Sequence, residues 1–95
     1  MSKISSRGNL VATNIRDLVP FETHGALKAV KSSEGIGQLN ANEYHLFIND
    51  VNDIDYIVYS YATPIAWHSR SNGWHKVSQK FSVTTSRHQS SLYMI

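Results

Sequence analysis

Residues 56–61 read Tyr-Ile-Val-Tyr-Ser-Tyr, and this run of β-branched and aromatic residues decides the fold class. Such residues favour extended backbone. Because the run is apolar at both alternating sets of positions, a strand formed by it needs cover on both faces. We therefore expect residues 56–61 to form a central strand of a sheet.

A hairpin is predicted downstream of this strand. Pro64 interrupts the apolar run, residues 65–68 (Ile-Ala-Trp-His) resume it, and residues 74–77 (Trp-His-Lys-Val) form the returning strand. Between them lies Asn72-Gly73, a pair that tolerates the positive φ values of a tight two-residue turn. The sequence therefore predicts an antiparallel meander in the C-terminal half.

The register of the hairpin decides which side chains meet. With a two-residue Asn-Gly loop, His68, Arg70 and His75 share one face and the two tryptophans share the other. Two histidines beside an arginine would suit phosphate binding or general acid–base catalysis. A polar outer face above tryptophans in the core explains the same pattern. We favour this second interpretation, because a one-residue slip would rearrange every pair.

The segment after the hairpin offers a second candidate site. Residues 81–85 (Phe-Ser-Val-Thr-Thr) alternate as a further strand, and residues 86–95 fit a short C-terminal helix or tail. If a hydroxyl residue at 85–86 caps that helix, Arg87 and His88 lie in its first turn. A cation is unfavourable at a helix N-terminus unless an anion binds there. A bound phosphate or partner carboxylate would explain the arginine, and a capped helix with a hydrophilic surface is the alternative.

Two weaker elements are expected near the N-terminus. Thr13 or Asn14 would cap a short helix over residues 15–19 that ends at Pro20. Residues 26–31 (Ala-Leu-Lys-Ala-Val-Lys) would form an edge strand whose lysines discourage further pairing.

Residues 40–49 fit two secondary structures. As a helix, the segment has Asn40 as its N-cap and Glu43 at its third position. Its apolar face would then comprise Leu39, Tyr44, Phe47 and Ile48. As a strand, residues 44–48 are a short apolar run. We favour the helix.

Metal and cofactor sites are not expected. The three aspartates of residues 49–55 lack the glycine and the closing glutamate of a calcium-binding loop, so a solvated turn is predicted. The spacing of His68, His75 and His88 fits no compact zinc site. No residue is assigned a catalytic role.

Length and composition limit the remaining choices. The chain has 95 residues, of which 41% are hydrophobic, enough for one core. The absence of cysteine excludes a disulfide scaffold and thiol catalysis, and no apolar run approaches the length of a membrane span. We expect a disordered lead-in over residues 1–9 and a single α+β domain over residues 10–95. Its antiparallel sheet would have three to four strands, with one or two short helices packed on one face.

Charge is distributed unevenly along the chain. Residues 1–55 hold five Lys or Arg and all seven acids, whereas residues 56–95 hold four Lys or Arg and no acid. A basic, acid-free segment can attract an anionic partner, although four cations in forty residues is also an ordinary surface density. The candidate contact residues of this half are Arg70, His75, Lys80, Thr84, Thr85, Ser86, Arg87, His88 and Gln89.

Three stretches together resemble a group of small, uncharacterised proteins encoded by bacteriophages. The three stretches are residues 59–67 (YSYATPIAW), Gly73-Trp74 and residues 80–89 (KFSVTTSRHQ). The resemblance covers residues 56–89. It implies a phage or prophage origin and a setting in the host cytoplasm, and it directs attention to residues 84–89 without assigning them a role.

The function expected from the sequence is binding rather than catalysis. We expect a small accessory protein that docks on nucleic acid or on a host protein, such as a defence or replication factor that it inhibits. The alternative is a small metal-independent nuclease or phosphotransfer enzyme that uses histidine and arginine residues of the C-terminal half. Self-assembly through the lysine-guarded edge strand of residues 26–31 is a third interpretation.

Overall fold

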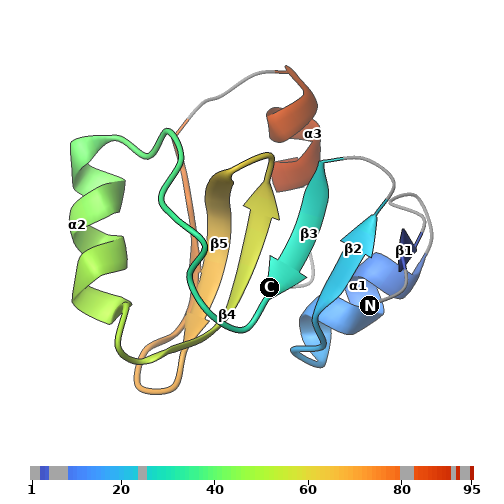
Figure 1. Ribbon diagram of the computed structural model, residues 1–95, viewed down its shortest axis with the longest axis horizontal. Helices are drawn as coiled ribbons and strands as arrows, with labels where there is room; N and C mark the ends of the chain where they lie inside the picture. The colour runs from blue at the N-terminus through green and yellow to red at the C-terminus, as the bar shows by residue number, and fades with distance from the viewer. Residues whose placement is uncertain (1–2, 5–8, 24–25, 80–82, 91, 93–94) are drawn as a thin grey trace.

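The chain folds into one twisted sheet with helices on both of its faces (Figure 1). The computed structural model describes residues 3–4, 9–23, 26–79, 83–90, 92 and 95. The strands are β1 (Lys3–Ile4), β2 (Phe21–Thr23), β3 (Leu27–Val30), β4 (Ile54–Ser60), β5 (Thr63–Ser69) and β6 (Gly73–Lys76). The helices are α1 (Asn9–Arg16), α2 (Ala41–Asp50) and α3 (Val83–Ser90). The predicted α+β class is confirmed.

The sheet is larger than the predicted three to four strands. In the described part of the chain its order is β1-β2-β3-β4-β5-β6, with β2 to β6 antiparallel and β1 parallel to β2. The prediction of an edge strand at residues 26–31 was wrong, because β3 pairs with β2 on one side and β4 on the other. Its Lys28 lies opposite Glu22 of β2 and forms an ion pair with Glu34. These acids make an interior position in the sheet acceptable for a lysine.

The central position of β4 confirms the predicted central strand, which spans Ile54–Ser60 and leaves Tyr61 in the turn that follows. Five consecutive residues of this strand, Tyr56 to Ser60, are buried. Tyr56 and Val58 belong to one apolar cluster, and Ile57 and Tyr59 belong to the other. Alternate residues of one strand thus supply both cores.

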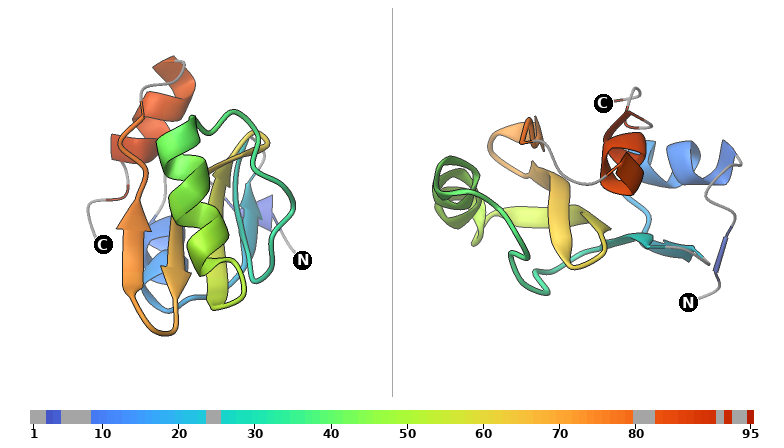
Figure 2. Two further views of the ribbon diagram at one scale, coloured as in Figure 1. Left: turned by 90° about the vertical axis from the view of Figure 1, so that its left-hand side faces the viewer. Right: turned by 90° about the horizontal axis from the view of Figure 1, so that it is seen from above.

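The prediction that the helices pack on one face was wrong. Val11 and Ile15 of α1 are buried in the cluster that contains Tyr56, while Phe47 of α2 is buried in the cluster that contains Trp67. Figure 2 (right) shows α1 and α3 on one side of the curved sheet and α2 on the other. Cover on both faces is what the two-sided apolar pattern of β4 requires.

The first helix begins earlier than predicted. It spans Asn9–Arg16, so Thr13 and Asn14 lie inside it rather than capping it. Val11 and Ile15 lie one turn apart in the helix and both are buried, so they form its inner face. After Arg16 the chain turns at Leu18, whose φ is 57°. Lys3, Ile4 and Asn9 lie in regular elements, although we expected residues 1–9 to be a disordered lead-in; the others of that stretch lie outside the described residues.

The helical interpretation of residues 40–49 is confirmed, including its cap. Asn40 is extended, and its side-chain oxygen accepts a hydrogen bond from the Glu43 N–H at 2.9 Å. The predicted apolar face is only partly correct. Glu43 and Phe47 are buried, whereas Tyr44 and Ile48 are 36% and 43% exposed.

Candidate functional site

The hairpin has a different register from the one the sequence predicts. Ser69 pairs with Gly73, so the loop has three residues, and Asn72-Gly73 is not a two-residue turn. Gly73 has a φ of 76°, which favours glycine at this position. As a result His68 lies opposite Trp74, and Trp67 lies opposite His75. The predicted faces were therefore wrong, and the two histidines project from opposite faces of the sheet.

His75 is part of a clamp between β6 and α2. Its Nε2 lies 2.7 Å from the Oε1 of Glu43, a residue that is only 5% exposed. The other carboxylate oxygen accepts hydrogen bonds from the backbone N–H and the hydroxyl of Ser78. The centroid of the His75 ring also lies 4.6 Å from that of Trp67, with the two ring planes inclined by 36°. These contacts attach the helix to the edge of the sheet.

His68 is held by a separate set of contacts on the opposite face. Its Nδ1 lies 2.7 Å from the Oδ1 of Asp55, and its ring meets the edge of Trp74. Asp55 therefore joins β4 to β5 rather than offering a metal ligand. The end of α2 is attached in a similar way, because Asp50 accepts hydrogen bonds from the Trp67 indole and from Asn72.

Asp53 binds the hairpin loop. The side chain and backbone N–H of Ser71 hydrogen-bond to its carboxylate and lower the pKa of Asp53. Among the described residues, no group of three or more His, Cys, Asp or Glu is arranged to hold a metal ion.

The C-terminal site is built differently from the prediction. Residues 83–85 lie in α3 rather than in a strand, so Arg87 falls in the last turn of the helix and not in the first. A cation in the last turn is favourable, and no bound anion is needed to explain it. The side chain of Thr84 and the whole of Lys80 lie outside what the structure describes.

The inner side of α3 forms a polar cluster with the end of β4. The Ser60 hydroxyl lies 2.7 Å from the Nδ1 of His88 and 3.0 Å from the Thr85 hydroxyl. Ser60 and Thr85 are buried, at 1% and 4% exposure, so neither hydroxyl is accessible to a large ligand. Burial lowers the pKa of His88. This cluster attaches α3 to the sheet.

The predicted contact residues do not form one surface. Arg70 lies in the β5–β6 loop, 4.0 Å from Asp53, and Arg87 lies on α3 at the other end of the sheet (Figure 1). Gln89 donates hydrogen bonds to the backbone oxygens of Val77 and Gln79. Ser86 is half-buried on α3. No single basic patch therefore unites these residues in the described part of the chain.

The three histidines are also too far apart to act together. His68 pairs with Tyr56 at the start of β4, and His88 bonds to Ser60 at its end. Four residue steps along the strand separate these two positions, about 13 Å. His75 projects from the opposite face.

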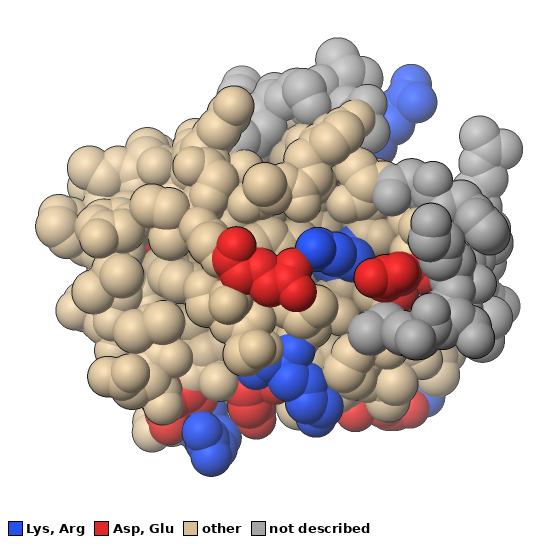
Figure 3. Space-filling view, in the orientation of Figure 1, with Lys and Arg blue, Asp and Glu red and all other residues tan. Residues whose placement is uncertain are grey.

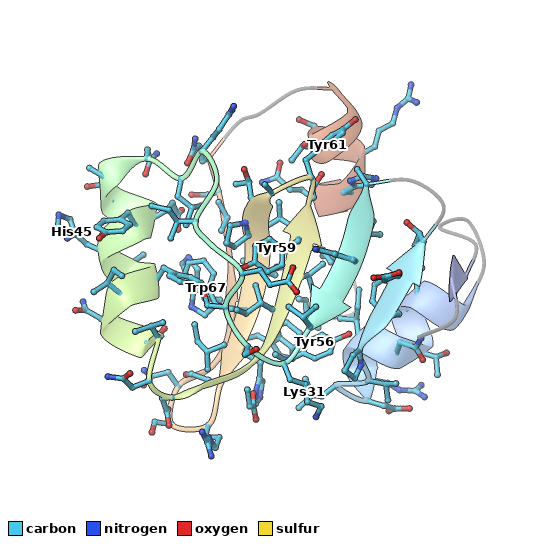
Figure 4. The ribbon with its side chains drawn as sticks, viewed as in Figure 1. Lys31, His45, Tyr56, Tyr59, Tyr61 and Trp67 are labelled. Carbon is cyan, nitrogen blue, oxygen red and sulfur yellow. The ribbon has the colours of Figure 1, made fainter. Side chains whose placement is uncertain are left out.

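The exposed surface of α2 is the feature that the sequence did not reveal. Tyr44 and Ile48 are exposed on one flank of the helix, one turn apart, and Leu46 is exposed on the other flank at 45%. None of the exposed residues of α2 is Lys, Arg, Asp or Glu. Figure 4 shows His45 pointing outward from α2, and Figure 3 shows no lysine or arginine over this helix. Glu43, at the third position of the helix, is the sequence signal that could have revealed this surface. Because Glu43 faces the core, Tyr44 and Ile48 are turned away from it.

Comparison with known proteins identifies the family. Residues 25–93 match DUF8033, a family of unknown function. The chain belongs to this family. The match runs from β3 to the C-terminal segment and so includes the whole of α2. No curated protein and no solved structure matches the chain. Within the described residues of this DUF8033 member, no helix is long and apolar enough to span a bilayer.

Proposed function

We propose that this DUF8033 protein is a small non-enzymatic binding protein that docks on another protein through one flank of α2. The flank consists of Ala41, Tyr44 and Ile48, which are spaced i, i+3 and i+7. Residues with this spacing lie within a sector of about 60° on a helix and can enter a groove together. We call these three residues the α2 flank.

Exposure of large apolar side chains without neighbouring charge is the observation that carries the proposal. Tyr44 and Ile48 keep 36% and 43% of their surface exposed on a helix whose exposed residues carry no formal charge. Contiguous apolar surface of this kind is typical of contact sites on soluble proteins. Tyrosine is also among the residues that contribute most to binding energy.

The size of the flank favours a concave protein partner. One side of a helix about 10 Å across and 15 Å long has a surface area on the order of 250 Å². A stable interface needs about 800 Å² from each partner. A groove that wraps α2 and also covers the preceding loop, residues 36–39, would add the missing area. The partner we expect therefore has an apolar, uncharged groove.

A protein fits this surface better than nucleic acid does. Phosphate recognition needs clustered lysine or arginine. In the described part of the chain, Arg16, Lys28 and Arg70 each lie within 4.0 Å of an acid, and no lysine or arginine lies on α2. That the partner is a host protein, and that binding inhibits it, rests on the resemblance to phage-encoded proteins.

The test compares two charges placed on opposite flanks of the same helix. Ile48→Glu places a carboxylate on the α2 flank, and Leu46→Glu places one about 160° around the axis at nearly equal exposure. Partners are captured from cells that express the protein, purified and titrated against each variant. We expect Ile48→Glu to weaken binding at least about tenfold and Leu46→Glu to change it less than about twofold. Equal losses, or none, would reject the α2 flank as the contact site.

A second titration tests nucleic acid as the alternative partner. Labelled single- and double-stranded DNA and RNA are titrated with the protein at low and high salt. Binding that weakens steeply with salt and is lost in Arg87→Ala would replace the protein partner with a nucleic-acid one.

A further inference from the structure

The outer edge of β6 carries unpaired backbone groups. In the described part of the chain β6 is the last strand of the sheet, and Figure 2 (left) shows it at the margin. The Val77 N–H donates to the Ile65 carbonyl, so residues 77 and 75 face β5 with their backbone groups. In an antiparallel pair, the residues that alternate with these along the strand direct their N–H and C=O groups outward. Those residues are Trp74 and Lys76.

These four outward groups form a ready template for another strand. Neither the N–H nor the C=O of Trp74 or Lys76 has a hydrogen-bond partner among the described residues. An edge in this state favours pairing with a further chain. The surface is distinct from the α2 flank, so the inference goes beyond the proposed function.

We infer that β6 pairs antiparallel with β6 of a second copy, about a two-fold axis through His75. In this register Trp74 of each copy lies opposite Lys76 of the other. All four outward N–H and C=O groups of each strand are then used, because both of these residues occupy hydrogen-bonded positions. A two-fold axis closes the pairing at two copies and leaves no β6 edge for a third.

The position of Lys76 favours the same register. A lysine on an edge strand usually discourages pairing, because like charges meet across the junction. With the axis at His75, Lys76 meets the Trp74 ring of the second copy, a contact that attracts a cation. An axis at Lys76 would instead place the two lysines opposite one another. Lys76 therefore favours the axis at His75 over the axis at Lys76.

The expected dimer is weak, since two four-residue strands bury far less than about 800 Å² on each side. Sedimentation velocity of the full chain from about 10 µM to about 1 mM tests for it. We expect the sedimentation coefficient to rise with concentration toward that of a dimer. A coefficient that stays at the monomer value throughout would overturn the inference.

Lys76→Pro provides the matched variant. Proline removes the outward N–H of residue 76 and leaves the bonds from residues 75 and 77 to β5 in place. We expect this variant to stay monomeric with an unchanged circular dichroism spectrum, and Lys76→Arg to dimerise like the parent. Ile48→Glu should also dimerise, which separates this inference from the proposed function. Dimerisation of Lys76→Pro, or its loss in Ile48→Glu, would place the interface elsewhere.

Amide exchange in the unaltered protein gives a result that does not depend on any variant. The N–H groups of Trp74 and Lys76 should exchange more slowly as the concentration rises, while those of exposed loop residues such as Ser33 stay unchanged. Exchange rates of the Trp74 and Lys76 N–H groups that are equal at low and high concentration would contradict pairing through β6.

Discussion

At the scale of single residues, two described residues other than glycine adopt a backbone conformation that normally favours glycine. Leu18 and Tyr61 both have a φ of 57°. For a residue with a Cβ this conformation costs about 1–2 kcal/mol. Leu18 packs against the core cluster that contains α1, which offsets the strain. Tyr61 is 60% exposed (Figure 4), and its hydroxyl makes no hydrogen bond to another described residue.

Tyr61→Gly is therefore expected to stabilise the fold. Glycine relieves the strain and removes little buried surface, so the melting temperature should rise by about 2–5 °C. Leu18→Gly, with the same φ, should lower it because apolar packing is lost. Thermal denaturation followed by circular dichroism measures both. A lower melting temperature for Tyr61→Gly would show that the tyrosine makes a stabilising contact.

His88 should make the stability depend on pH. Burial lowers the pKa of His88 in the folded chain, so the unfolded chain binds a proton more readily. The free energy of unfolding should therefore fall as the pH drops below about 6.5. In His88→Gln this fall, measured by urea denaturation at about pH 7 and pH 5, should be smaller. The exposed His45→Gln is the control and should retain the fall of the parent; identical behaviour of the two variants would contradict this assignment.

At the scale of elements, the attachment of α2 depends on a buried polar contact as well as on Phe47. The Glu43 carboxylate accepts hydrogen bonds from Ser78 and lies 2.7 Å from the His75 ring. Such a group specifies where the helix sits, because each donor would lose its partner if the helix shifted.

Glu43→Gln tests this attachment. The amide cannot accept at both oxygen positions, so we expect a loss of about 1–3 kcal/mol in the free energy of unfolding. Glu34→Gln is the matched control, because that carboxylate is exposed in its ion pair with Lys28, and the loss should be below about 0.5 kcal/mol. Urea denaturation measures both changes. Similar losses for the two variants would mean that the clamp does not hold α2.

At the scale of the whole molecule, β4 joins two apolar cores, one that includes residues of α1 and one that includes Phe47 of α2. Ile57 and Tyr59 belong to the core under α2, and Tyr56 and Val58 to the core under α1. If β4 left one core, its residues in the other core would also become exposed. We therefore expect one cooperative unfolding transition.

The two tryptophans report on the two cores separately. Trp67 is buried in the core under α2, and Trp74 packs against the core under α1. In Trp74→Phe the fluorescence of Trp67 reports on the first core, and in Trp67→Phe that of Trp74 reports on the second. In each variant the fluorescence and circular dichroism transitions in urea should coincide. Separate midpoints would show that the cores unfold independently.

The local elements of this protein are largely determined by its sequence. The apolar run of residues 56–61 specified a central strand, and Asn40 with Glu43 specified the start of α2, because both signals act within a few residues. The alternation of residues 81–85 predicts a strand, but residues 83–85 lie in a helix, since alternation over so short a stretch is a weak signal.

Tertiary structure alone decided which side chains meet. A three-residue hairpin loop in place of a two-residue one moved His75 to the face of Trp67, and no local pattern distinguishes these loops. The burial of Glu43, which exposes the α2 flank, depends on His75 and Ser78, more than thirty residues away in the chain. Contacts across such distances depend on the packing of whole elements, so the candidate site emerged from the fold while its framework was already present in the sequence.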